Sequence, residues 1–131
     1  MRIRRIAILA FVVASPLALG GCFLVAAGAG AAGAIAYTNR GASSDVSGAI
    51  DAVFDRSVTA FSAAGIRETG RSTEDSGAKR RLTGAKGELE VIVEMERKGS
   101  ETTKVEVIAR TNAVDYDKKL AEDVLNHIIA H

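Results

Sequence analysis

Hydrophobic residues follow two different patterns along this chain. From Ile6 to Tyr37 almost every residue is apolar or glycine, and beyond this run the apolar residues recur at regular spacings. The first such set has the period of a helix face, and Gly65 suits the position just after its last turn. It predicts a helix over residues 48–64 with Ser47 as its N-cap. The residues that form this face are Ile50, Val53, Phe54, Val58 and Phe61.

Two later segments alternate between apolar and mostly polar residues and predict a β-hairpin over residues 88–96 and 103–110. The apolar positions are Leu89, Val91, Val93 and Met95, then Val105, Val107 and Ala109. A three-residue loop at 98–100 keeps these residues on one face and pairs Val93 with Val105 and Val91 with Val107. The same register places Arg97 opposite Glu101, Glu94 opposite Lys104 and Glu88 opposite Arg110.

Weaker patterns predict the remaining elements. Residues 37–47, 66–74 and 78–85 are expected to form strands, with turns at 75–77 and 86–87. A last helix, capped within residues 112–115, would bury Tyr116, Leu120, Val124, Leu125 and Ile128. The fold class is therefore α+β, one small domain of order β-α-β-β-β-β-α. It would have an antiparallel four- to five-stranded sheet with two helices on one face, a topology similar to that of TATA-box-binding-protein-like folds.

The N-terminal apolar run has the layout of a secretory signal peptide. Arg2, Arg4 and Arg5 precede it, Pro16 interrupts it, and small residues come before the single cysteine. Leu19, Gly20, Gly21 and Cys22 resemble the lipobox of bacterial lipoproteins, which implies cleavage before Cys22 and acylation of its thiol. Residues 1–21 are then a lipoprotein signal peptide, 22–40 a lipidated and Gly/Ala-rich tether, and 41–131 the α+β domain.

Two alternatives stay open in this region. The run from Ile6 to Tyr37 is long enough to be an uncleaved transmembrane helix, and in both cases the basic residues at 2–5 direct the domain outward. Within 23–36, Ala26, Gly30 and Ala34 recur every four residues, as do Ala29 and Gly33. Such spacing suits a self-associating membrane helix, whereas so many glycines favour a flexible tether.

Composition limits the partners. The chain has one cysteine, so no intramolecular disulfide forms. It carries 17 basic and 16 acidic residues, and removal of the three signal arginines leaves 14 basic residues and a net charge of about −2. This balance and export both argue against a nucleic-acid partner. The sequence leaves the oligomeric state open.

Three charged groups are candidate sites. Lys79, Arg80, Arg81 and Lys86 form a basic patch that would face an anionic partner or protect an edge strand. Glu88, Glu90, Glu94 and Glu96 form an acidic ridge that is best explained as a solvated strand face. His127 and His131 are four apart on a helix, but two ligands rarely hold zinc. We therefore expect no metal, no cofactor and no catalytic residues.

The whole chain also resembles a family of small bacterial lipoproteins that carry a domain of unknown function. The resemblance rests on Gly21-Cys22, the run through Gly33-Ala34, Ala36-Tyr37, Ala52-Val53-Phe54, Gly65-Ile66, the 87–110 hairpin and the helix from Asp115. The resemblance brings no catalytic residues. Our first hypothesis is a lipid-anchored, non-enzymatic envelope protein that binds another envelope component. Phe23 after Cys22 implies the periplasmic face of the outer membrane if the host has two membranes. The alternatives are a ligand-binding or weakly hydrolytic domain, with its site between helices and sheet, and a self-assembling membrane protein.

Overall fold

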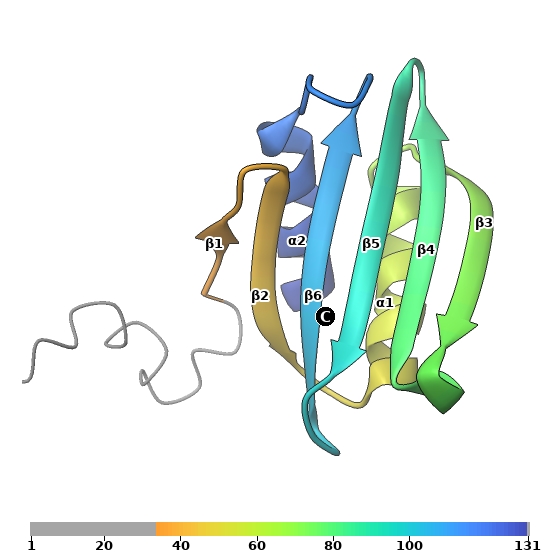
Figure 1. Cartoon of the computed structure of the whole chain (residues 1–131), viewed down its shortest axis with the longest axis vertical. Coiled ribbons are helices and arrows are strands. Elements are labelled where there is room, and N and C mark those ends of the chain that lie inside the picture. Colours follow the sequence, from red (N-terminus) through yellow and green to blue (C-terminus); the bar gives the residue numbers. More distant parts are fainter. Residues whose placement is uncertain (1–33, 131) are drawn as a thin grey trace, which may run out of the picture.

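The computed structural model describes residues 34–130. They form one antiparallel sheet whose concave side is covered by two helices (Figure 1). The predicted α+β class, the antiparallel sheet and the element order are confirmed, but the sheet has six strands where four or five were expected. The elements are β1 (Ala36–Tyr37), β2 (Gly41–Ser47), α1 (Ile50–Ala63), β3 (Arg67–Glu74), a 3₁₀ turn η1 (Asp75–Gly77), β4 (Lys79–Lys86), β5 (Leu89–Arg97), β6 (Thr102–Arg110) and α2 (Lys118–Ile129).

The strands lie in the order β1-β2-β6-β5-β4-β3. The extra strand is β1, which pairs Ala36 with Ser43 and Tyr37 with Ala42 in a segment that the sequence assigned to the tether. Helix α2 packs on β2 and β6, and α1 packs mainly on β4 and β5. The chain enters the sheet at the edge formed by β1, and β3 forms the opposite edge (Figure 1).

The core lies between the helices and the sheet and is almost wholly aliphatic. Alternate residues of the central strands point into it, as the sequence predicted, and Phe54 and Phe61 of α1 are its largest members. The strand contributions are Ala42, Val46, Leu82, Val91, Val93, Met95, Val105, Val107 and Ala109. Tyr116, which was expected in this core, is only half-buried, and its hydroxyl donates to the carbonyl of Ala113 at 2.9 Å.

Both helices begin later than the sequence predicted. Ser47 ends β2 instead of capping α1, because its strand stays paired with β6 as far as Thr102. The turn that follows needs Gly48, whose φ of 129° is open to glycine and costly for other residues. Asp117 caps α2 by accepting from the backbone N–H of Leu120 at 2.9 Å. Asn112 holds a separate turn by accepting from the N–H groups of Val114 and Asp115.

The β5–β6 hairpin has a different register from the predicted one. Val93 pairs with Val107 and Met95 with Val105, a shift of two residues, so that the connecting loop has four residues rather than three. A shift of two keeps every side chain on its predicted face. It also brings Ile92 opposite Ile108, on the face away from the helices, and both are buried.

Edge strand β3 contains an irregularity that sets the direction of its side chains. Its register with β4 shifts between Glu68 and Gly70, as in a β-bulge. Because of this shift, Glu68 and Arg71 lie on the same face and form a bidentate ion pair of 2.7 and 2.9 Å. All but one of the β3 residues are exposed, and the charges and the bulge protect this edge against pairing with another chain.

Candidate functional site

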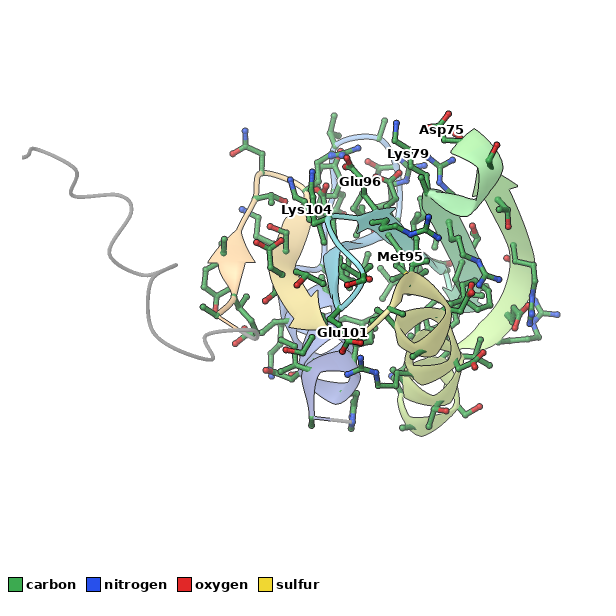
Figure 2. The ribbon with its side chains drawn as sticks, turned by 90° about the horizontal axis from the view of Figure 1, so that it is seen from below. Asp75, Lys79, Met95, Glu96, Glu101 and Lys104 are labelled. Carbon is green, nitrogen blue, oxygen red and sulfur yellow. The ribbon has the colours of Figure 1, made fainter. Side chains whose placement is uncertain are left out.

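The sheet face that points away from the helices, called the open face below, carries most of the strand charges. Figure 2 shows Lys79, Glu96 and Lys104 on this face, whereas Met95 points toward the helices. Strand alternation explains the separation, since successive side chains point to opposite faces of a sheet. The even-numbered residues of β5 and β6 and the odd-numbered residues of β4 therefore form the open face.

Neighbouring strands place opposite charges side by side in one row of the open face. The pairing runs from Glu74 of β3 through Lys79, Glu96 and Lys104 to Asp45 of β2, so the sign of the charge alternates on five successive strands. Adjacent strands are about 4.8 Å apart, which lets each side chain interact with both neighbours. This row is the most regular feature of the open face.

The next row breaks the alternation. Arg81 lies opposite Glu94, but Glu94 lies opposite Glu106, a like-charge pair that is unfavourable when directly opposed. Each carboxylate interacts with an arginine on its outer side. Arg81 donates to Glu94 at 2.8 Å, and Arg40, from the β1–β2 turn, lies 3.5 Å from Glu106.

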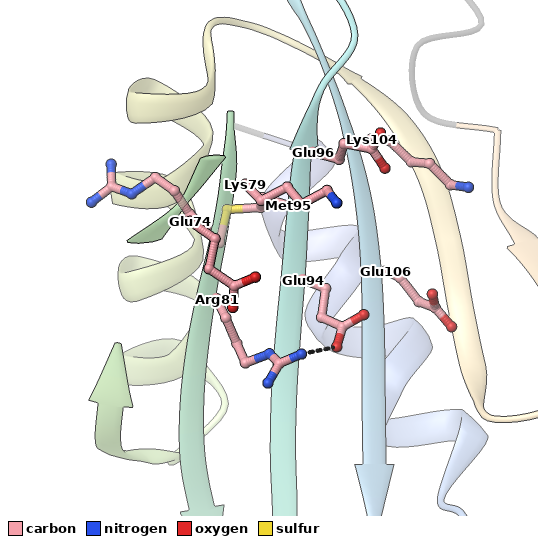
Figure 3. Close-up of a pocket in the computed structure, with 9 residues that line it drawn as sticks. Glu74, Lys79, Arg81, Glu94, Met95, Glu96, Lys104 and Glu106 are labelled. Atoms are coloured by element: carbon pink, nitrogen blue, oxygen red, sulfur yellow. Dashed lines mark hydrogen bonds and ion pairs between the residues drawn. The ribbon is translucent and has the colours of Figure 1, made fainter. Parts of the chain in front are cut away.

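A hollow of about 320 Å³ lies over these two rows (Figure 3). We call it the charged hollow. Its charged side chains on the open face are Glu74, Lys79, Arg81, Glu94, Glu96, Lys104 and Glu106. Figure 3 shows Arg81 and Glu94 in contact across β4 and β5, with Glu106 pointing outward from β6.

The pKa values of two groups reflect this arrangement. A hydrogen bond from Lys98, at 3.1 Å, lowers the pKa of Glu96, and the charges of Lys98, Lys79 and Lys104 lower it further. Conversely, a hydrogen bond to Asp75 and the charges of Asp75 and Glu96 raise the pKa of Lys79. Both shifts favour the charged forms, so Glu96 and Lys79 stay ionised near neutral pH.

The structure separates the four residues of the predicted basic patch. Lys79 and Arg81 line the charged hollow, whereas Arg80 points to the opposite face and stacks on Phe54 at 3.8 Å from the ring centroid. The Arg80 guanidinium also donates to Asp51 of α1 at 2.6 Å, and its Nε is buried with no hydrogen-bond partner. Lys86 pairs with Leu89 at the far end of β4.

The predicted acidic ridge is divided among separate ion pairs. Glu94 and Glu96 line the charged hollow, Glu90 pairs with Arg110 at 2.9 Å, and Glu88 lies in the β4–β5 turn. The sequence missed the contributions of Lys104 and Glu106, because the predicted register gave Lys104 a different partner. Ile92 and Ile108 could have indicated the observed register. Each interrupts the polar alternation of its strand, and pairing the two places them side by side.

The space between helices and sheet contains no ionisable group among the buried residues of 34–130. Its buried polar residues are Ser44, Ser57 and Thr103, and each donates to a backbone carbonyl: Asp45 at 3.4 Å, Val53 at 2.8 Å and Gly48 at 3.0 Å. Converging polar groups therefore lie on the open face and not at the site that the sequence favoured for a ligand.

A family model described as a protein of unknown function, DUF3568, matches residues 5–130. The chain belongs to the DUF3568 family. The comparison with curated proteins gave no match. The match confirms the resemblance to an uncharacterised family, and lipidation and the likeness to TATA-box-binding-protein-like folds stay predictions.

Two predicted features of this DUF3568 chain lie wholly or partly outside the described residues. These are the segment from Leu19 to Cys22, with the Gly/Ala run as far as Gly33, and His131 of the histidine pair. His127 is exposed on α2, and residues 34–130 contain no group of three or more potential metal ligands. Within the same range, no helix has the length and hydropathy needed to cross a membrane.

Proposed function

We propose that this chain is a lipid-anchored protein of the cell envelope whose domain faces outward and binds another envelope component through the open face. The observation that carries the anchor is the sequence Leu19-Gly20-Gly21-Cys22 at the end of a basic and apolar signal. A thioether at Cys22 also explains a lone cysteine in an exported chain. Acyl chains contribute about 0.8 kcal/mol per buried methylene, so two or more hold a protein stably on a bilayer.

The open face supports a binding role better than a catalytic one. Glu94, Glu96 and Glu106 lie in ion pairs on an exposed surface, whereas a general acid or base usually needs burial to move its pKa toward neutrality. Within the charged hollow, the hydrogen bond from Lys98 lowers the pKa of Glu96, which moves this carboxylate further from neutrality. We therefore propose a non-enzymatic protein that needs no cofactor. Phe23 after Cys22 favours the periplasmic face of the outer membrane in a host with two membranes.

The anchor is tested by the intact mass of the membrane-extracted chain. Cleavage before Cys22 together with added acyl groups is expected, and both should be lost in Cys22→Ala. Gly28→Ala, which lies outside the cleavage motif, is the matched control and should be processed normally. A full-length mass without acyl groups would mean that residues 6–37 act as a transmembrane anchor.

The binding role is tested by a photo-crosslinking residue placed in turn at Lys104 and at Lys119. Lys104 lies on the open face, and Lys119 lies on the exposed side of α2, where it pairs with Asp123 at 3.3 Å. We expect a specific envelope protein to crosslink at the first position only. Equal labelling at both positions, or none at either under any growth condition, would contradict this proposal.

Self-assembly is the second proposed function, and the spacing of Ala26, Gly30 and Ala34 favours it. Replacement of Gly30 and Gly33 by Leu would block close helix contact and should reduce the oligomer size measured in mild detergent. An unchanged size would eliminate this function.

A further inference from the structure

The charged hollow contains both signs of charge within reach of one small molecule. On the open face its cations are Lys79, Arg81 and Lys104, and its anions are Glu74, Glu94, Glu96 and Glu106, whereas Arg80, which also lines it, points to the helix side. Most of them interact with a neighbour, but Lys104 and Glu74 form no ion pair with any residue of 34–130. Lys104 is therefore a cation with no ion-pair partner in this range. Glu74 lies three strands away on β3, too far from Lys104 for one amino acid to contact both.

The geometry of β6 places an open cation close to a carboxylate. Lys104 and Glu106 are two residues apart on the same face, so their Cα atoms are separated by about 6.8 Å. Glu106 has only long contacts, 3.4 Å from the Thr38 hydroxyl and 3.5 Å from Arg40. It also lies opposite Glu94, and an additional positive group would relieve the repulsion between these two carboxylates.

From this arrangement we propose that the charged hollow binds a small zwitterion, a free amino acid or a short peptide. Its ammonium group would interact with Glu106 and Glu94, and its carboxylate with Lys104 and Lys79. The ammonium and carboxylate of an amino acid are a few ångströms apart. With a hydrogen bond at each end, the ligand spans a distance that the flexible side chains of two residues about 6.8 Å apart on one strand can reach. This inference deepens the binding role proposed above and rests on it, but it does not depend on acylation of Cys22.

Charge selectivity follows from the same residues. An anion without a positive group would approach four carboxylates, and a cation without a negative group would approach three basic side chains. Only a ligand with both charges can interact favourably with the basic and the acidic side chains at once. The volume of about 320 Å³ accommodates one or two amino acid residues. The hollow is exposed and its ion pairs are screened by water, so the affinity should be in the millimolar range.

The test is a titration of the full-length chain in a nonionic detergent, followed by amide NMR shifts. Free glycine and diglycine are the probes, because they distinguish an amino acid from a peptide, and acetate and methylammonium represent the two halves of glycine. We expect saturable shifts along β5 and β6 with one or both of the first two and none with the other two. Lys104→Gln and Glu106→Gln should each weaken binding by about three- to tenfold, and Lys119→Gln on α2 should not change it.

Three outcomes would overturn this inference: no saturable shift with either zwitterion, equal shifts with acetate or methylammonium, or equal effects of Lys119→Gln and Lys104→Gln. The amide spectra of the unliganded variants show whether each is folded, so a folding defect is not mistaken for lost binding. If the titrations fail while a protein still crosslinks at Lys104, the zwitterion is wrong and the proposed binding role stands. Failure of both removes the binding role.

Discussion

The guanidinium of Arg80 lies 3.8 Å from the centroid of the Phe54 ring and covers this buried aromatic from the strand side. Phe54 is 2 % exposed, and the guanidinium of Arg71 approaches the same ring at 5.2 Å. A stretch of sequence that looked like one basic surface thus contains a residue that joins the sheet to α1. Arg80 belongs to the packing of the fold, and its neighbours Lys79 and Arg81 belong to the open face.

Arg80→Ala should therefore destabilise the domain by about 1–2 kcal/mol, because it removes a partly desolvated cation–π contact together with the ion pair to Asp51. Urea denaturation measures the change. Lys79→Ala is the matched control, since it removes a neighbouring charge from the open face and should cost less than about 0.5 kcal/mol. Equal losses in the two variants would contradict the assignment of Arg80 to packing.

Gly84→Ala should destabilise the domain by about 1–3 kcal/mol through overpacking. A Cβ at this position would lie 2.5 Å from Ile66 Cγ2, 2.7 Å from Phe61 Cε2 and 2.9 Å from the carbonyl oxygen of Arg67. Gly70→Ala is the control on the neighbouring strand, because no atom lies within 4 Å of its added Cβ. Thermal unfolding of both variants should show a lower Tm for Gly84→Ala alone.

The hydrogen bond from Arg71 lowers the pKa of Glu68 below its ordinary value. A carboxyl with a lower pKa in the folded state stabilises the fold at pH values above its unfolded pKa, and this contribution is lost as the pH falls through the folded pKa. NMR titration of Glu68 should show the lowered pKa, and Arg71→Ala should raise it toward the ordinary value of a glutamate. The exposed position of both residues keeps the associated stability change small.

Arg56→Ala should loosen the junction between β2, α1 and α2. The Arg56 guanidinium donates to the carbonyl of Ser47 and, at 3.3 Å, to the carbonyl of Ile128 in the last turn of α2. Amide hydrogen exchange should therefore become faster around Gly48 and at the end of α2. Exchange in β5, which Arg56 does not contact through these bonds, is the internal reference. A uniform increase throughout the domain would indicate general destabilisation instead.

The sequence predicted the faces of β5 and β6 correctly but not their register. An apolar period of two cannot distinguish registers that differ by two residues. The predicted register was chosen because it placed opposite charges across the hairpin, but exposed ion pairs contribute only about 0.2–1 kcal/mol each. In the observed register Ile92 pairs with Ile108, and burial of such a side chain contributes about 1.5–3 kcal/mol. The gain from the isoleucines outweighs the cost of placing Glu94 opposite Glu106.

The candidate site could be predicted only in part for the same reason. The sequence singled out Lys79, Arg81, Glu94 and Glu96, but it grouped them by charge along single strands. The charged hollow depends on which residues become neighbours across β3, β4, β5 and β6, and this is a property of register. The separate role of Arg80 depends on the position of α1, which strand alternation alone does not give.

The two-residue strand β1 also sets how the domain responds to mechanical load. Tension applied through the N-terminal segment reaches β1 first, where only Ala36 and Tyr37 pair with β2. Strand β2 is held far more firmly, through seven residue pairs with β6 and through its packing against α2. Under tension β1 should therefore detach first and lengthen the connection by a few residues, while the core and the open face stay folded.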